Sequence, residues 1–152
     1  MKKLWTEIKS TFSYYNNNPL SIEEEDCVTR AISLASSRSY ADIKDKLYYM
    51  AQLLECNALC VCCYSILLDY IFQYDRVPAR GYTVGEIVQK YNNSTLLIRT
   101  DGHLTCALNG TIHDLWDCSD ELADIVWVVN WIIYHFFAYS PVKKWVFSGY
   151  YI

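Results

Sequence analysis

Residues 94–117 read STLLIRTDGHLTCALNGTIHDLWD, and this stretch decides the fold class. It contains three runs with a strand-like pattern of apolar and β-branched residues, STLLIRT, HLTCAL and TIHDLWD. Asn109 and Gly110 separate the last two runs, and Asn-Gly in that position is the strongest short signal for a β-hairpin. We therefore expect antiparallel strands in this part of the chain.

The residues before these strands carry helical signals instead. Four acidic residues, Glu23 to Asp26, precede a run in which apolar residues recur on one helical face, namely Val28, Ala31, Ile32 and Ala35. Cys27 lies in the first turn of this expected helix.

Two further helices are expected, each beginning at a capping pair. Ser39 precedes Asp42 and opens a helix that points Ile43, Leu47 and Met50 inward, and Thr83 precedes Glu86 in the same way. Helical character is expected to continue through residues 53–72. Helices thus come first and antiparallel strands second, which predicts an α+β fold with helices on one side of the sheet.

Composition indicates one globular domain over residues 1–152. Hydrophobic residues make up 53% of the chain, which is enough for a substantial core. The net charge is −4 and the basic residues are scattered, so nucleic acid is not an expected partner. The first residues lack an apolar run of signal-peptide length, which predicts a cytoplasmic location, or the host cytoplasm for a phage protein. Ile125 to Tyr139 is apolar but shorter than a membrane span, so we expect buried strands or a buried helix there.

The cysteine pattern indicates free thiols. Seven is an odd number, and a reducing compartment disfavours a disulfide framework. Three of the clustered cysteines are spaced for one helical face, Cys56, Cys60 and Cys63, and Cys62 lies among them. Because this spacing matches no zinc pattern and no histidine is near, we expect neither a metal nor a cofactor.

Cys27 and His103 are the candidate nucleophile and base. A helix N-terminus stabilises a thiolate, and His103 at the start of a strand could hold an imidazole beside it. A third group must orient the imidazole, and the register of the hairpin decides which carboxylate can do so.

If Asn109 and Gly110 form a two-residue turn, Leu108 faces Thr111, and Asp114 shares a face with His103 and orients its ring. If Gly110 forms a bulge, the register shifts and Asp117 becomes the orienting carboxylate instead of Asp114.

Two segments also resemble a known family. DCVTRAISLASSRSYADIKDKL, beginning at Asp26, and TVGEIVQKYNNSTLLIRTDGHLTCALNGTIHDLWDCSD, beginning at Thr83, are similar to the two halves of small papain-like cysteine peptidases from phages and bacterial mobile elements. The resemblance covers about two thirds of the chain, and the blocks occur in the right order. It implies a papain-like fold and a triad of Cys27, His103 and Asp114.

One position departs from the papain-like pattern. Those enzymes place a glutamine about six residues before the nucleophile, where it stabilises the oxyanion, and here Ser21 occupies that position. The backbone N–H of Cys27 could supply one donor, and a side-chain amide from Asn16, Asn17 or Asn18 could supply another.

Two functions follow from these expectations. The first is a hydrolase in which the Cys27 thiolate attacks the carbonyl of a peptide or isopeptide in a protein substrate. The second is an inactive papain-like binding protein of a phage that inhibits or sequesters a host protein; the missing glutamine and the acidic residues before Cys27 favour it. The two differ in the reactivity of Cys27.

Overall fold

A computed structural model describes residues 11–129 of the chain, and the fold and site are those of this range. Its helices are α1 (Cys27–Ser36), α2 (Tyr40–Leu54), α3 (Val61–Ile66), the π-helical η1 (Leu67–Ile71) and α4 (Val84–Lys90). Its strands are β1 (Thr11–Tyr14), β2 (Asp75–Val77), β3 (Thr95–Thr100), β4 (His103–Leu108), β5 (Thr111–Asp114) and β6 (Ile125–Val129). The protein is therefore of the mixed α+β class, as the sequence predicted.

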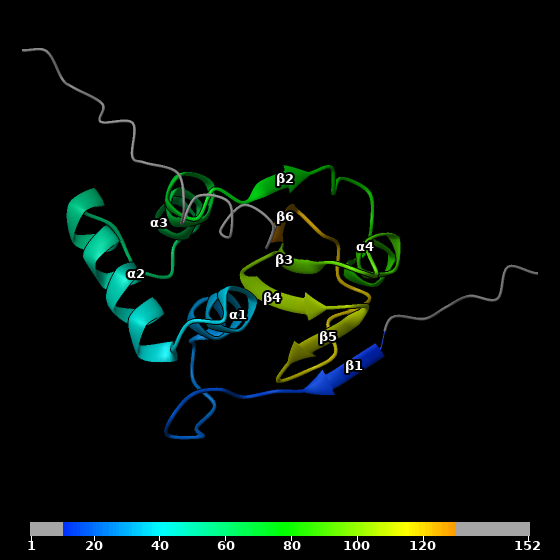
Figure 1. Cartoon of the computed structure of the whole chain (residues 1–152), viewed down its shortest axis with the longest axis horizontal. Coiled ribbons are helices and arrows are strands. Elements are labelled where there is room, and N and C mark those ends of the chain that lie inside the picture. The colour runs from blue at the N-terminus through cyan, green and yellow to red at the C-terminus, as the bar shows by residue number, and fades with distance from the viewer. Residues whose placement is uncertain (1–10, 130–152) are drawn as a thin grey trace, which may run out of the picture.

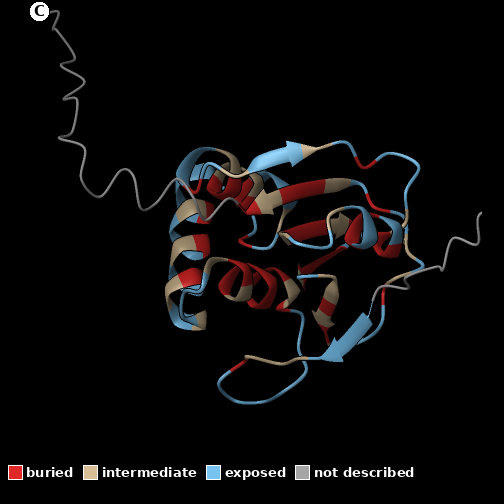
Figure 2. Ribbon diagram, turned by 45° about the vertical axis from the view of Figure 1, so that its right-hand side comes forward, coloured by how far each residue is buried: buried red, intermediate tan, exposed pale blue. Residues whose placement is uncertain are grey.

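The strands form one six-stranded sheet in the order β1-β5-β4-β3-β6-β2 (Figure 1). The expected order, helices first and antiparallel strands second, is only partly right. β1 precedes every helix and pairs with β5 in parallel, and β2 comes from the first half of the chain. Both are edge strands with exposed residues, so their sequences lack the apolar alternation that marks a half-buried strand (Figure 2).

Helices cover both faces of the sheet, which corrects the expectation of a single covered face. Helix α1 packs with Leu97 and Cys106, whereas α4 packs with their neighbours Leu96, Ile98 and Ala107 on the opposite face. A strand with apolar residues in succession can bury all of them only when both faces are covered. The run Leu96 to Ile98 is such a sequence.

Helix α1 is the central helix of the fold. Its apolar face, Val28, Ala31, Ile32 and Ala35, is buried as predicted. The helix lies between α2 and strand β4, and Figure 2 shows burial concentrated in α1 and the middle strands. The end of α1 that carries Cys27 is thereby held against the sheet.

The capping predictions are confirmed at two helices. The Ser39 hydroxyl accepts a hydrogen bond from the backbone N–H of Asp42 at the start of α2. Thr83 and Glu86 form a reciprocal capping box at α4. In α2, Ile43 and Leu47 are buried as expected.

The Asn-Gly hairpin is also confirmed. Leu108 pairs with Thr111, so Asn109 and Gly110 form a two-residue turn. Both have positive φ, 48° and 83°, as a type I′ turn requires. The alternative register, in which a bulge at Gly110 shifts the following strand, is wrong.

The segment 53–72 differs from the continuous helix that was expected. Helix α2 ends at Leu54, and a non-helical turn precedes α3. Cys60 and Cys62 form a disulfide in this region, so the expectation of free thiols is wrong for that pair. The apolar segment 125–139 begins with a strand, β6, which confirms the expected buried strand there. The remainder of that segment lies outside the described residues. Within residues 11–129, no helix has the length and apolar character needed to cross a membrane.

Candidate active site

Cys27 is the first residue of helix α1, at a helix start whose backbone N–H groups lack a side-chain cap. Asp26 occupies the N-cap position but makes no capping hydrogen bond, because its carboxylate is bound to Arg30, Asn18 and Tyr40 instead. An uncapped helix N-terminus offers free N–H groups and partial positive charge. Both favour a thiolate at Cys27.

His103 and Asp114 form a buried hydrogen-bonded pair beside this thiol. Nε2 of His103 lies 2.7 Å from Oδ2 of Asp114, and the two residues are only 8% and 3% exposed. His103 begins β4 and Asp114 ends β5, so the hairpin register places them on one face of the sheet. Asp117, the other carboxylate that the sequence left open, accepts a hydrogen bond from the backbone N–H of Ser119.

The pKa values of Cys27 and His103 move in the directions that favour an ion pair. Burial raises the pKa of the Cys27 thiol, but interactions with the His103 imidazole, the backbone N–H of Leu104 and the charge of Arg30 outweigh it and lower the pKa. Burial has the opposite effect on His103 and lowers its pKa, but hydrogen bonds with Asp114, Cys118 and Cys27 outweigh burial and raise this pKa to about 11. The arrangement therefore favours an imidazolium at neutral pH and shifts the Cys27 thiol toward its thiolate form.

Asp114 is held in its charged form by two cations. Burial raises the pKa of its carboxyl, whereas the hydrogen bond and charge of His103 outweigh burial and lower it. Oδ1 of Asp114 accepts a hydrogen bond from the backbone N–H of Leu115 at 2.8 Å and lies 3.4 Å from Nη1 of Arg30. Arg30 in turn donates from Nε to Oδ1 of Asp26 at 2.6 Å. The pair His103–Asp114 is thus part of a buried ionic network.

Two side chains enclose the His103 imidazole. The Trp116 ring lies over it with a centroid separation of 4.2 Å and is itself 44% exposed. Cys118 is buried in the loop between β5 and β6, and its sulfur lies near both His103 and Asp114. An imidazole shielded in this way keeps its orientation and has little contact with water.

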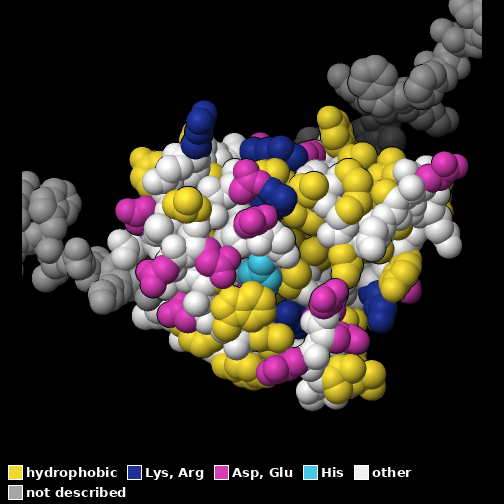
Figure 3. All heavy atoms as spheres, turned by 180° about the vertical axis from the view of Figure 1, so that it is seen from behind, with side chains coloured by type: hydrophobic (Ala, Val, Ile, Leu, Met, Phe, Trp, Pro, Cys, Tyr) yellow, Lys and Arg dark blue, Asp and Glu magenta, His cyan; other side chains and the backbone are white. Residues whose placement is uncertain are grey.

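Cys27 and His103 line a cleft of about 930 Å³ whose walls are strongly acidic. Five of the lining residues are carboxylates: Glu23, Glu24, Glu25, Asp101 and Glu121. The lining cations Arg30 and Arg99 are already paired with carboxylates outside the lining. Figure 3 shows one face of the molecule on which acidic and hydrophobic side chains surround an imidazole. The cleft therefore presents a negative potential to an entering molecule.

The asparagines suggested as oxyanion donors are engaged elsewhere. The side-chain amide of Asn16 donates to the backbone carbonyl of Ile22, and that of Asn17 donates to the backbone carbonyl of Arg30 and to the hydroxyl of Ser33. Asn18 donates to Asp26, Glu24 and Tyr40. The backbone N–H groups at the start of α1 lack a side-chain cap and are therefore candidate donors at the thiol.

Two groups in the described part of the chain have the geometry of a metal site. The sulfurs of Cys56, Cys60 and Cys62 lie within 4.8 Å of one another, and so do the ligand atoms of His103, Asp114 and Cys118. The second group belongs to the candidate active site, where the charge of Asp114 is already balanced by His103 and Arg30. The first group lies apart from that site.

The sequence predicted the three central residues but missed two of their neighbours. In the sequence, Arg30 stands four residues after Asp26, a spacing typical of ordinary ion pairs on a helix surface, and nothing there indicated its contact with Asp114. Cys118 carried no signal, because the loop that returns it to His103 has no periodic pattern. Comparison with models of protein families, with curated proteins and with solved structures finds no match to this chain.

Proposed function

We propose that the chain is a papain-like cysteine hydrolase that cleaves a peptide or isopeptide bond. The observation that carries the proposal is the contact between Cys27, at an uncapped helix N-terminus, and His103, whose Nε2 is bound to Asp114. A thiol with a lowered pKa, an imidazole and an orienting carboxylate are the parts that acyl transfer by cysteine requires.

In the proposed reaction the Cys27 sulfur attacks the carbonyl carbon of the substrate. The backbone N–H of Cys27 binds the oxyanion of the tetrahedral intermediate. His103 then donates its proton to the leaving amine, the carbon–nitrogen bond breaks, and a thioester remains on Cys27. Water, deprotonated by His103, attacks the thioester and releases the acid and the thiolate. Asp114 keeps the ring oriented and stabilises its charged form.

A second candidate is a binding protein that keeps this arrangement without turnover. It is favoured by the oxyanion position, where Ser21 replaces the expected glutamine and the three nearby asparagine amides are engaged elsewhere. The partner in that case is a host protein bound at the cleft.

The reactivity of Cys27 and the capacity for turnover test the two candidates in turn. We expect iodoacetamide to modify Cys27 faster than the other cysteines below the usual thiol pKa, as followed by mass spectrometry of digests. His103→Ala is expected to abolish that advantage, whereas Arg38→Ala, a substitution at an exposed ion pair, is not. An unreactive Cys27 in the wild-type chain would rule out the hydrolase.

Turnover is measured separately on a mixture of peptides derived from digested protein. New termini that form with the wild-type chain but not with Cys27→Ala support the hydrolase. A reactive Cys27 without any new termini, together with capture of one intact protein by both forms, supports the binding protein.

A further inference from the structure

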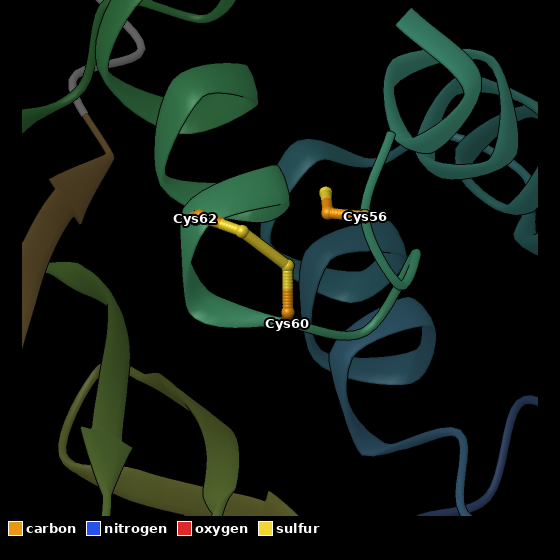
Figure 4. Close-up of side chains that lie close together, drawn as sticks. All are labelled: Cys56, Cys60 and Cys62. Carbon is orange, nitrogen blue, oxygen red and sulfur yellow. A yellow bond between two sulfur atoms is a disulfide. The ribbon is translucent and has the colours of Figure 1, made fainter. Parts of the chain in front are cut away.

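Four of the seven cysteines lie within residues 56–63, and none of the four belongs to the catalytic group. The sulfurs of Cys56, Cys60 and Cys62 lie within 4.8 Å of one another. Figure 4 shows Cys56 on the segment that follows α2, and Cys60 and Cys62 joined at the start of α3. The end of α2 and the start of α3 thus bring three cysteine sulfurs close together.

Cys63 borders this group without belonging to it. Its sulfur donates to the backbone carbonyl of Leu47 at 3.4 Å, whereas its backbone N–H donates to Sγ of Cys60 at 3.4 Å. After reduction of the disulfide, that N–H favours a thiolate at Cys60. Adjacent thiols oppose each other's ionisation unless a cation lies between them.

The protein supplies no cation of its own in this segment. Residues 54–66 contain no lysine, arginine or histidine. Sulfur ligands select soft or borderline metals, and three of them supply most of a tetrahedral zinc site, with the fourth position left for water or another ligand. The sequence spacing C-x₃-C-x-C-C matches no common zinc pattern. The sulfurs come together in the folded chain because the turn between α2 and α3 folds this segment back.

We propose that Cys56, Cys60 and Cys62, in their reduced form, bind one thiophilic divalent cation such as Zn²⁺. The Cys60–Cys62 disulfide is the oxidised form of the same site. A dithiol reductant supplies two electrons and two protons to convert the disulfide into two thiols. Binding of the cation then displaces the thiol protons. Oxidation removes two of the three ligands and releases the cation, so binding depends on the redox state.

The position of this thiol cluster relates it to the cleft. Leu59 and Val61 lie between the cysteines in sequence, and both line the cleft that contains Cys27. A cation that fixes residues 56–63 also fixes this wall. The metal site itself is independent of the proposed hydrolase activity, since none of its ligands belongs to the catalytic group.

The test uses the full chain with Cys27→Ala, which removes the reactive thiol as a competing ligand. The protein is reduced with a phosphine, desalted without oxygen and titrated with Co²⁺. We expect one equivalent to bind, with a sulfur-to-cobalt charge-transfer band and the visible absorption of tetrahedral cobalt, and Zn²⁺ to displace it. Protein oxidised with diamide is expected to show neither band until it is reduced.

Substitutions assign the ligands. Cys62 is exposed, so Cys62→Ser is expected to fold and to weaken Zn²⁺ binding by about tenfold or more. Cys118→Ser is the matched control, because Cys118 belongs to the other group with metal-site geometry, and it is expected to leave binding unchanged. Circular dichroism confirms that each variant is folded.

A measurement on the unsubstituted chain avoids any dependence on folding of variants. Zn²⁺ is expected to protect Cys56, Cys60 and Cys62 from alkylation and to leave Cys106 and Cys118 as they were. The proposal is overturned if reduced protein gives no thiolate band, if the band survives Cys60→Ser with Cys62→Ser, or if Cys118→Ser alone removes it.

Discussion

Arg30 reaches from helix α1 to strand β5 and places Nη1 3.4 Å from Oδ1 of Asp114, while its Nε binds Asp26 at 2.6 Å. All three side chains are almost completely buried. One guanidinium thereby pairs with two buried carboxylates, and it connects the start of α1, which carries Cys27, to the hydrogen-bond partner of His103.

Arg30→Met is expected to destabilise the protein by about 3–5 kcal/mol, because it leaves Asp26 and Asp114 buried without their cation. The free energy of unfolding is measured by urea denaturation. Arg38→Met is the matched control: Arg38 pairs with Asp42 at the surface and is expected to contribute less than about 1 kcal/mol. Equal losses in the two variants contradict the importance of the buried network.

The rate of Cys27 alkylation is expected to depend on pH through both members of the pair. In the wild-type chain the rate rises at a pH below the usual thiol pKa, because His103 and Arg30 stabilise the thiolate. In His103→Ala, the thiol loses the imidazole that offsets the effect of burial, so the pKa of Cys27 rises and the midpoint of the alkylation rate moves to higher pH. Mass spectrometry of digests after timed labelling gives both midpoints. An unchanged midpoint contradicts an interaction between the two side chains.

The raised pKa of His103 also predicts how stability depends on pH. The folded pKa is about 11 against 6.5 for a free imidazole, so the stabilisation is complete below pH 6.5 and is lost as pH rises toward about 11. Because ionisation of Cys27 acts in the opposite direction, the test compares Cys27→Ala with Cys27→Ala/His103→Gln. The urea midpoint of the first is expected to fall more steeply above pH 6.5. Parallel curves for the two variants contradict the prediction.

The acidic cleft predicts discrimination by charge. Glu25 and Asp101 are exposed carboxylates that line it, and neither forms an ion pair within residues 11–129. Glu25→Gln with Asp101→Asn is expected to speed the reaction of Cys27 with anionic iodoacetate and to leave neutral iodoacetamide unaffected, at a pH where the thiol is fully ionised. The difference is expected to shrink in high salt. Equal effects on both reagents contradict a role for the potential.

The Asn-Gly turn predicts a stability effect. Gly110 has a φ of 83°, a left-handed backbone conformation that residues with a side chain rarely adopt, whereas an added Cβ would meet its nearest atom at an ordinary contact distance of 3.5 Å. Gly110→Ala is therefore expected to destabilise the protein by about 1–2 kcal/mol through backbone strain. Asn109→Gly, at φ 48°, is the control and is expected to preserve stability. Urea denaturation at neutral pH distinguishes the two. Equal stability of Gly110→Ala and the wild type contradicts the strain argument.

Local signals explain why much of the fold was predictable. The apolar spacing after Cys27, the capping pairs at Ser39 and Thr83 and the Asn-Gly turn each involve residues a few positions apart. The turn alone determined that Asp114 and His103 share a face. By contrast, β1 and β2 form because other strands offer them hydrogen bonds, and their own exposed residues carry no period. Arg30 and Cys118 acquire their roles only through contacts with distant segments.

The same separation in sequence gives the site an order of assembly. Cys27 belongs to the first helix, whereas His103 and Asp114 belong to a hairpin made much later during synthesis of the chain. A newly made N-terminal portion thus carries an ordinary thiol, with no imidazole to ionise it. If the proposed activation of Cys27 holds, it begins only when β4 and β5 have joined the sheet, and selective labelling of this thiol would then count finished molecules.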